Sequence, residues 1–388
     1  MKIIKNANII TMENEDFSCG YMLVDGEKIA EIGDMKTVPA VDASCEVVDA
    51  EGLTLLPGFI DAHCHVGVWE EGIGQEGLDL NESTDPITPQ LRAIDAINPF
   101  DEAFYNAKMA GVTTVVTGPG SANVFGGQFA ALKTDGNCVD KMILKAPVAQ
   151  KAALGENPKR IYSAKGAMPK TRMASAALMR ETLAKAKEYA RKWDEYKVDS
   201  KNKSRPEFDF KMDSLMPVIK KEIPLKMHAH RADDISTAIR IGEEFDLWIT
   251  LEHCTEAHLI ADILAEKNLP ITLGPTMTGK SKPELRNLSY EAYTELEKRG
   301  IEFSIMTDHS EILIEQLYLS AVMAVKNGLS ERAALKAITI NAAKNTGIDD
   351  RVGSLKVGKD ADFILMSGKP MSFDAKVESV TINGKLIF

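Results

Sequence analysis

The chain has 388 residues, roughly two to three times the length of a typical single domain. Acidic residues outnumber basic ones by 57 to 46, and this balance argues against a nucleic-acid-binding protein, which would normally show a basic face. Five scattered cysteines without a CxxC pair fit a reducing cytoplasm. The first residues turn acidic where a signal peptide would be apolar, and no uncharged apolar run approaches a membrane span. We expect a cytoplasmic protein whose partner is a small-molecule substrate, with no nucleic acid and no membrane.

Both ends of the chain have the pattern of short β-strands. Residues 1–56 mix β-branched residues with turn pairs such as Asp25-Gly26, which is a hairpin signal. Residues 351–388 show the same pattern, with Asn383-Gly384 as a tight turn. We therefore predict that residues 1–56 and 351–388 are the two parts of one small β-sandwich domain.

The middle of the chain, residues 57–350, alternates apolar runs with amphipathic segments. A strand is predicted over 111–116 and a helix over 173–195, and three later strands, each followed by a helical segment, are predicted over 223–230, 246–253 and 301–309. Repeated strand–helix units imply parallel pairing. The predicted fold class is α/β, with a (β/α)8 TIM-like barrel over 57–350 and a small β-sandwich formed by both termini. The turn-rich segments 118–127 and 155–160 are expected to be loops at the barrel rim.

Two histidines stand two residues apart at the end of the first barrel strand. His63 and His65 follow the apolar run LTLLPGFIDA. Because residues i and i+2 of a strand face the same side, both imidazoles would point into the mouth of the barrel. A pair of neutral imidazoles is a natural ligand set for Zn²⁺ or a similar cation, although one HxH pair alone is a weak signal.

Three more polar residues end predicted barrel strands. His228 ends IPLKMH, His253 ends LWITLEH and Asp308 ends FSIMTD, on what we count as strands 5, 6 and 8. The carboxyl ends of barrel strands share one rim, where active sites form. Together with His63 and His65 they make four imidazoles and one carboxylate, which suits one or two divalent metals per chain, such as zinc. His230 shares a face with His228, so the strand alone leaves open which of the two binds metal.

This ligand set predicts metal-assisted hydrolysis. A divalent metal lowers the pKa of bound water toward ~7 and polarises the carbonyl under attack. Asp308 could act as the general base that accepts the proton of this water and passes it to a leaving amine. The chain has no GxSxG elbow to support a serine mechanism. We expect hydrolysis of an amide, cyclic amide or peptide-like C–N bond by metal-activated hydroxide.

The ordered set of motifs resembles the amidohydrolase superfamily. It consists of LPGFIDAHCH, HAH, EHC, TDH and AAKNTGIDDRVGSLKVGKDADFILM, and covers nearly the whole chain. The chain is most similar to the imidazolonepropionase-like branch, which also holds metal-dependent dipeptidases. The resemblance implies a metal-dependent barrel with a small β-sandwich, and it implies metal ligands at His63, His65, His228, His253 and Asp308.

Many two-metal members of this superfamily add a bridging carboxylated lysine or a glutamate from a middle strand. The resemblance implies Lys151 as the bridge, with Glu156 as the alternative. A lysine takes up CO₂ only when its amine is deprotonated, so Lys151 must be desolvated.

His230 and Arg231 are the predicted substrate-binding residues, because His230 faces the mouth and the Arg231 guanidinium matches a carboxylate. True imidazolonepropionases carry an acidic residue where this chain has His230, which argues against their substrate here.

Two other functions stay open. A deaminase of the same fold would attack an amidine-like carbon, often with one metal. A non-catalytic assembly protein on the same barrel would have lost metal ligands, whereas the set inferred here is intact. The sequence leaves the subunit number open, a homo-oligomer included.

Overall fold

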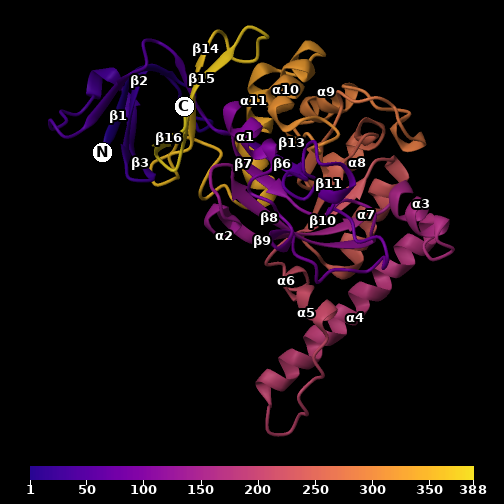
Figure 1. The fold of residues 1–388 in the computed structure, drawn as a ribbon. Helices are drawn as coiled ribbons and strands as arrows, with labels where there is room; N and C mark the ends of the chain where they lie inside the picture. The colour runs from indigo at the N-terminus through magenta and orange to yellow at the C-terminus, as the bar shows by residue number, and fades with distance from the viewer.

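Strands from both termini form one sheet in the computed structural model, which describes residues 1–388 (Figure 1). Its order is β16-β15-β14-β5-β1-β2-β3, and β4 pairs with β1. Because β14 lies between β5 and β15, the end of the chain completes a sheet that the beginning starts. The strands are β1 (Lys2–Ile9), β2 (Phe17–Asp25), β3 (Lys28–Asp34), β4 (Glu46–Asp49), β5 (Thr54–Pro57), β14 (Phe363–Ser367), β15 (Lys376–Ile382) and β16 (Lys385–Leu386).

A second sheet of eight strands forms a nearly closed barrel, in sequence order from β6 to β13. Backbone hydrogen bonds from Asp308 N to His63 O (3.2 Å) and from His65 N to His309 O (3.0 Å) join its first and last strands. The predicted fold class, a TIM-like barrel with a small β-sandwich formed by both termini, is confirmed for the barrel and for a separate sheet domain from the termini, while the domain limits stay a prediction. The barrel strands are β6 (Phe59–Cys64), β7 (Val112–Thr117), β8 (Phe125–Lys133), β9 (Ile143–Ala153), β10 (Leu225–Ala229), β11 (Ile249–His253), β12 (Ile271–Leu273) and β13 (Phe303–Ile305).

One barrel strand departs from the predicted parallel pairing. β8 runs antiparallel to both β7 and β9. The reason lies in its connections, because residues 118–124 before β8 and 134–142 after it are too short for a parallel crossover of a dozen or more residues. The segment 118–127, predicted as a rim loop, therefore ends inside β8.

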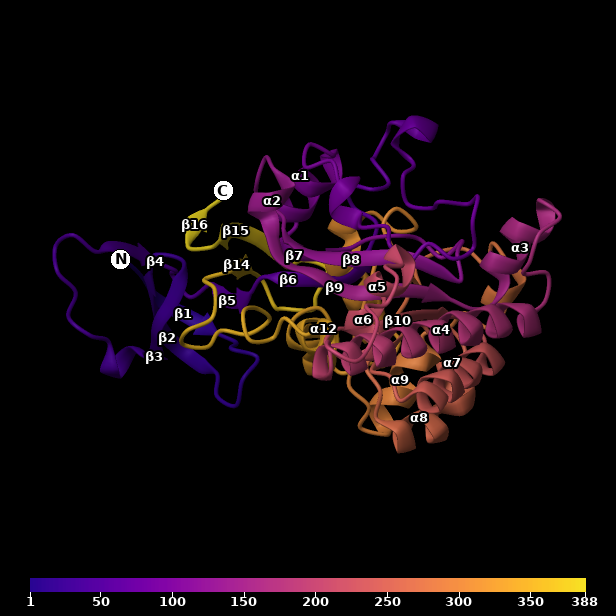
Figure 2. The ribbon, with the colours of Figure 1, turned by 90° about the horizontal axis from the view of Figure 1, so that it is seen from below.

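The helices cover the outside of the barrel, and the longest of them extends beyond it. In Figure 1, α4 and the loop that follows it project from the body as an arm, and in Figure 2, which is seen from below, α4 lies in front of the barrel. α4 contains the predicted helix 173–195, and its Thr171 side chain caps the first turn by accepting from Ala174 N. The helices are α1 (Glu102–Met109), α2 (Val139–Met142), α3 (Glu156–Ala164), α4 (Arg172–Val198), α5 (Phe210–Ser214), α6 (Met216–Ile219), α7 (Ala232–Phe245), α8 (Ala261–Lys267), α9 (Glu291–Lys298), α10 (Leu317–Lys326), α11 (Glu331–Ala337) and α12 (Ile340–Thr346).

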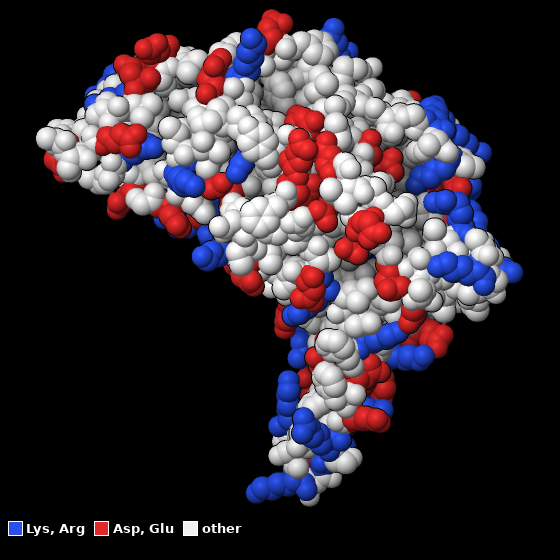
Figure 3. Space-filling view, in the orientation of Figure 1, with Lys and Arg blue, Asp and Glu red and all other residues white.

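The face seen in Figure 3 carries both positive and negative side chains. Asp and Glu gather near the middle of the body, and Lys and Arg lie toward the end of the arm. None of the helices, including the 27-residue α4, has both the length and the apolar composition needed to span a lipid bilayer.

Alternating residues of β14 join the two sheets. Ile364 and Met366 belong to the main core around the barrel, whereas Phe363 and Leu365 belong to the separate core of the terminal sheet. Successive side chains of a strand point to opposite faces, so one strand contributes to both cores. This packing fixes the terminal sheet against the barrel next to β6, the strand that carries His63.

Candidate metal centre

The first cluster of candidate ligands joins the two strands that close the barrel. His63 and His65 come from the end of β6, and Asp308 follows β13. Asp308 Oδ1 lies 3.1 Å from His65 Nε2 and 3.6 Å from His63 Nε2. One ligand atom from each residue lies within 4.8 Å of the others. The structure therefore brings these three predicted residues together as a possible cation site.

The second cluster consists of His228, His230 and His253. β10 and β11 are paired in parallel with Ala229 opposite His253, which places all three imidazoles at one height. The ring centroids of His228 and His253 are 4.2 Å apart, and those of His230 and His253 are 4.5 Å apart. Ligand atoms of the three residues again lie within 4.8 Å of one another. His230 is thus as close to a cation position as His228.

The free nitrogens of these rings fit a metal ion. His230 Nδ1 contacts Thr255 Oγ1 at 2.8 Å and His253 Nδ1 contacts Gly274 O at 3.0 Å, which orients both rings. His230 Nε2 and both nitrogens of His228 are buried without a hydrogen-bond partner. Buried polar atoms are nearly always paired, and metal-binding histidines usually have their second nitrogen fixed in this way.

Burial favours the neutral form of His228 and His253, which is the form that binds metal. It lowers the pKa of His228 to about 4 and the pKa of His253 well below the usual value. For Asp308, burial raises the pKa, but a hydrogen bond to His65 and nearby positive charges lower it more, so that it falls below its usual range. The backbone is strained at two of these residues, with φ of 72° at His253 and 52° at Asp308.

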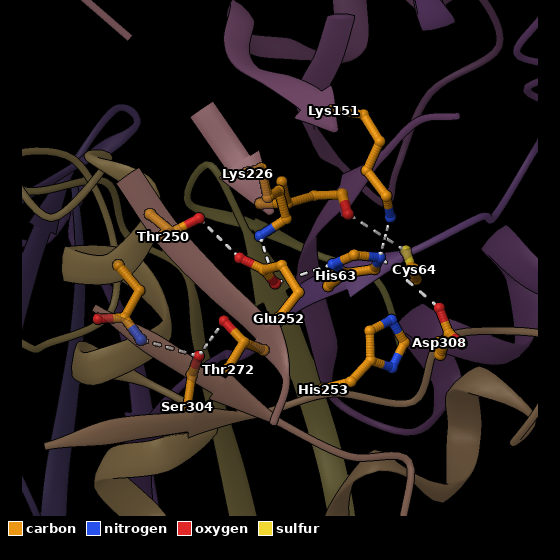
Figure 4. Close-up of polar contacts among 12 residues, drawn as sticks. His63, Cys64, Lys151, Lys226, Thr250, Glu252, His253, Thr272, Ser304 and Asp308 are labelled. Carbon is orange, nitrogen blue, oxygen red and sulfur yellow. Dashed lines mark hydrogen bonds and ion pairs between the residues drawn. The ribbon is translucent and has the colours of Figure 1, made fainter. Parts of the chain in front are cut away.

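Lys151, the residue predicted to bridge two cations, lies beside the first cluster. Its side chain on β9 is completely buried, and Nζ lies 2.9 Å from His63 Nε2 (Figure 4). The pKa of Lys151 is lowered to about 7, mainly by burial and to a smaller extent by the charge on Lys226, although the charges of Asp308 and Glu252 oppose the shift. A large fraction of this amine is thus neutral near pH 7. The alternative, Glu156, starts α3 at the wall of the cavity, where its backbone N–H donates to Glu284.

A buried hydrogen-bond network that the sequence did not reveal orients His63. Glu252 lies 2.8 Å from His63 Nδ1, pairs with Lys226 Nζ at 2.9 Å and accepts from Thr250 Oγ1 at 2.7 Å (Figure 4). With Nδ1 donating to Glu252, His63 presents the lone pair of Nε2 to the first cluster. Two charged residues, Lys226 and Glu252, inside otherwise apolar strands are the sequence feature that could have indicated this network.

Asp61 is a second residue that the sequence reasoning missed. It is completely buried and accepts hydrogen bonds from His63 N (3.0 Å) and Thr307 N (3.1 Å). It also accepts from Thr307 Oγ1. Burial raises the pKa of Asp61 to about 7. The side chain ties β6 to the end of β13 and thereby holds both halves of the first cluster.

The clusters open into a cavity of about 460 Å³, large enough for a small molecule. Its wall includes His65, His228, His230 and Asp308. The predicted substrate-binding residue Arg231 is not brought to this wall, because its guanidinium makes two hydrogen bonds with Asp233, of 2.9 and 2.8 Å. The cations that line the cavity are Arg160 and Lys282. Arg160 lies there because residues 156–160, predicted as a loop, form the start of α3.

The amidohydrolase family model matches residues 54–387. The chain therefore belongs to the amidohydrolase family, which places it among metal-dependent hydrolases that act on carbon–nitrogen bonds.

Solved and curated relatives agree with this assignment. The structure of an amidohydrolase from Thermotoga maritima is 41% identical, with a TM-score of 0.95 over 100% of both chains. The amidohydrolase tasK of Hapsidospora irregularis is 27% identical over 95% of this chain, which spans only 40% of that protein's length. An imidazolonepropionase from Fusobacterium nucleatum is 24% identical, over 100% of this chain and 95% of its own. Deaminases are among the other distant relatives.

Proposed function

We propose that this protein hydrolyses an amide, cyclic amide or peptide-like C–N bond of a small molecule with two bound divalent cations, in the first instance Zn²⁺. The observation that carries the proposal is the pair of adjacent ligand clusters, each with ligand atoms within 4.8 Å of one another, and each with residues that line the same cavity. The distance of 5.4 Å between the His63 and His253 ring centroids links the two clusters.

The residues divide between the two cations by cluster, except that we leave His230 of the second cluster for the substrate. His63, His65 and Asp308 would hold one, and His228 and His253 would hold the other. Lys151, carboxylated on Nζ, would lie between them, because two close cations repel unless anions bridge them. When bound, the cations supply Lewis acidity to the carbonyl and lower the pKa of a water molecule.

Side chains of the protein transfer the proton of the attacking water. Asp308 is ionised, faces the cavity and is held by His65, so it can accept a proton from the attacking water and deliver it to the leaving amine. His230 also faces the cavity with Nε2 free, and we assign it to substrate binding.

Elemental analysis of the purified protein, followed by a hydrolysis screen with and without the metal found, tests this proposal. We expect close to two metals per chain and metal-dependent cleavage within panels of N-acyl amino acids, dipeptides and cyclic amides. One metal per chain together with ammonia release from amidines or aminopurines would support a deaminase instead. Full turnover by metal-free protein would contradict the proposal.

A further inference from the structure

One wall of the catalytic cavity is rich in hydrogen-bond donors that the hydrolytic chemistry does not use. It is built by the start of α3 and by the loop after β12, which carries a 3₁₀ turn (Pro283–Leu285). Lys282 Nζ pairs with Glu284 at 2.8 Å and donates to Asn157 Oδ1 at 3.4 Å. Asn157 in turn donates to Ser121 Oγ at 2.9 Å. This chain of contacts positions the wall residues before any ligand arrives.

Arg160 is the cation on this wall that has no partner. Its guanidinium takes part in no ion pair, although Glu156 precedes it by one helical turn. In contrast, Arg172, Arg180 and Arg231 pair with Asp234, Glu244 and Asp233. A guanidinium left free at the wall of an active-site cavity can receive an anion from the substrate, and its planar fork matches a carboxylate.

The acidic residues of the cavity restrict where such an anion can lie. Glu311 lies close to Asp308, because its backbone N–H donates to Asp308 O at 2.9 Å and both residues line the cavity. In the metal-loaded protein this end would be taken up by the cations and the scissile bond, so an anionic group elsewhere on the substrate would extend toward the α3 side. There Arg160 and Lys282 line the cavity beside Glu156.

We propose that Arg160, assisted by Lys282, forms an anion subsite, so that the substrate carries a carboxylate on the side of the scissile C–N bond that faces α3. This inference rests on the proposed hydrolase function and narrows its substrate class to anionic amides, such as N-acyl amino acids. Arg160 is then a specificity-determining residue, while the metal ligands and Asp308 act on the bond.

The test compares a substrate with the same molecule lacking its carboxylate, namely N-acetylleucine and N-acetyl-3-methylbutylamine. Wild type, Arg160→Gln and the control Arg231→Gln are assayed in the metal-loaded form. We expect wild type and Arg231→Gln to prefer the acid, and Arg160→Gln to lose roughly 10- to 100-fold in kcat/KM for the acid alone. The loss should appear mainly in KM, because the contact forms equally in ground and transition states. Equal loss on both compounds, or no preference for the acid in wild type, would overturn the subsite.

A binding measurement keeps the inference testable if neither compound is hydrolysed. Trp69 lines the same cavity, so its fluorescence can report occupancy. N-acetylleucine and its decarboxylated counterpart are titrated into the same three metal-loaded proteins. Tighter binding of the acid to wild type and to Arg231→Gln, lost in Arg160→Gln, would support the subsite while the proposed hydrolysis of these compounds failed. Equal binding of both compounds to wild type would refute it.

Discussion

Replacing Glu252 by glutamine should weaken metal binding although Glu252 touches no metal. The carboxylate is completely buried and is approached by three groups, Lys226 Nζ, Thr250 Oγ1 and His63 Nδ1. The glutamine amide keeps one oxygen, and its NH₂ group would face a donor. Lys226, only 1% exposed, would also lose its counter-charge.

The magnitude follows from these contacts. Removing one partner of a buried ion pair costs about 3–5 kcal/mol, and a buried donor left unpaired costs about 1–3 kcal/mol. Since some hydrogen bonds survive in the amide, we expect Glu252→Gln to lower the free energy of unfolding by about 3 kcal/mol. Because Glu252 fixes the tautomer of His63, metal affinity should fall roughly 10- to 100-fold.

Competition with a chromophoric chelator measures the metal affinity, and chemical denaturation of the metal-free protein measures stability. Asp360→Asn is the matched control. Asp360 is also a buried carboxylate with several cationic partners, Lys28 (2.7 Å), Lys133 (2.9 Å) and Arg351 (2.9 Å), but it does not line the cavity. It should lose stability and keep its metal affinity. If Glu252→Gln binds metal as tightly as wild type, our view of how His63 is held is wrong.

Three further changes test the site and the architecture. The double variant His63→Ala/His65→Ala should lose most bound metal and activity while its circular dichroism spectrum stays native, and full metal content would remove both residues from the site. Lys151→Ala should bind about one metal instead of two and lose activity by orders of magnitude, with partial rescue by short carboxylic acids. Normal metal content and turnover would make Glu156 the next residue to test. Deletion of residues 355–388 removes β14 from β5, a fully buried strand, so the protein should aggregate. A monodisperse truncation with an unchanged melting temperature would contradict a shared terminal domain.

The positions of the rim residues could be predicted because they depend on local rules. The two-residue strand period places His63 and His65 on one face, and equal strand–helix spacing places His228 and His253 at one height. The direction of β8 relative to its neighbours could not be predicted in the same way. The residue pattern of Phe125–Lys133 predicts a strand, but it does not indicate whether that strand is parallel or antiparallel to β7 and β9. Only the length of its connections decides this.

Local sequence pattern also could not show which arginine lines the cavity. Arg231 follows a rim histidine directly, which made it the natural candidate, but Asp233 two residues later occupies its guanidinium. Arg160 lies 68 residues before His228, and only the start of α3 at Glu156 turns this segment toward the cavity. The same holds for Glu252 and His63, which meet from strands 189 residues apart.

The residues of the first cluster lie where the first and last strands of the barrel meet. His63 and Asp308 stand on the first and last strands, and Asp61 and two backbone hydrogen bonds already join these strands. A cation held by His63, His65 and Asp308 would bridge the same seam, and its binding free energy would add to the stability of the closed barrel. The backbone of Asp308 is in the left-handed region, with φ of 52°. Such a strained conformation persists only where the contacts around it are well ordered, as they are where the first and last strands meet. Under the proposed function, the residues that position Asp308 as general base are therefore the residues that close the barrel.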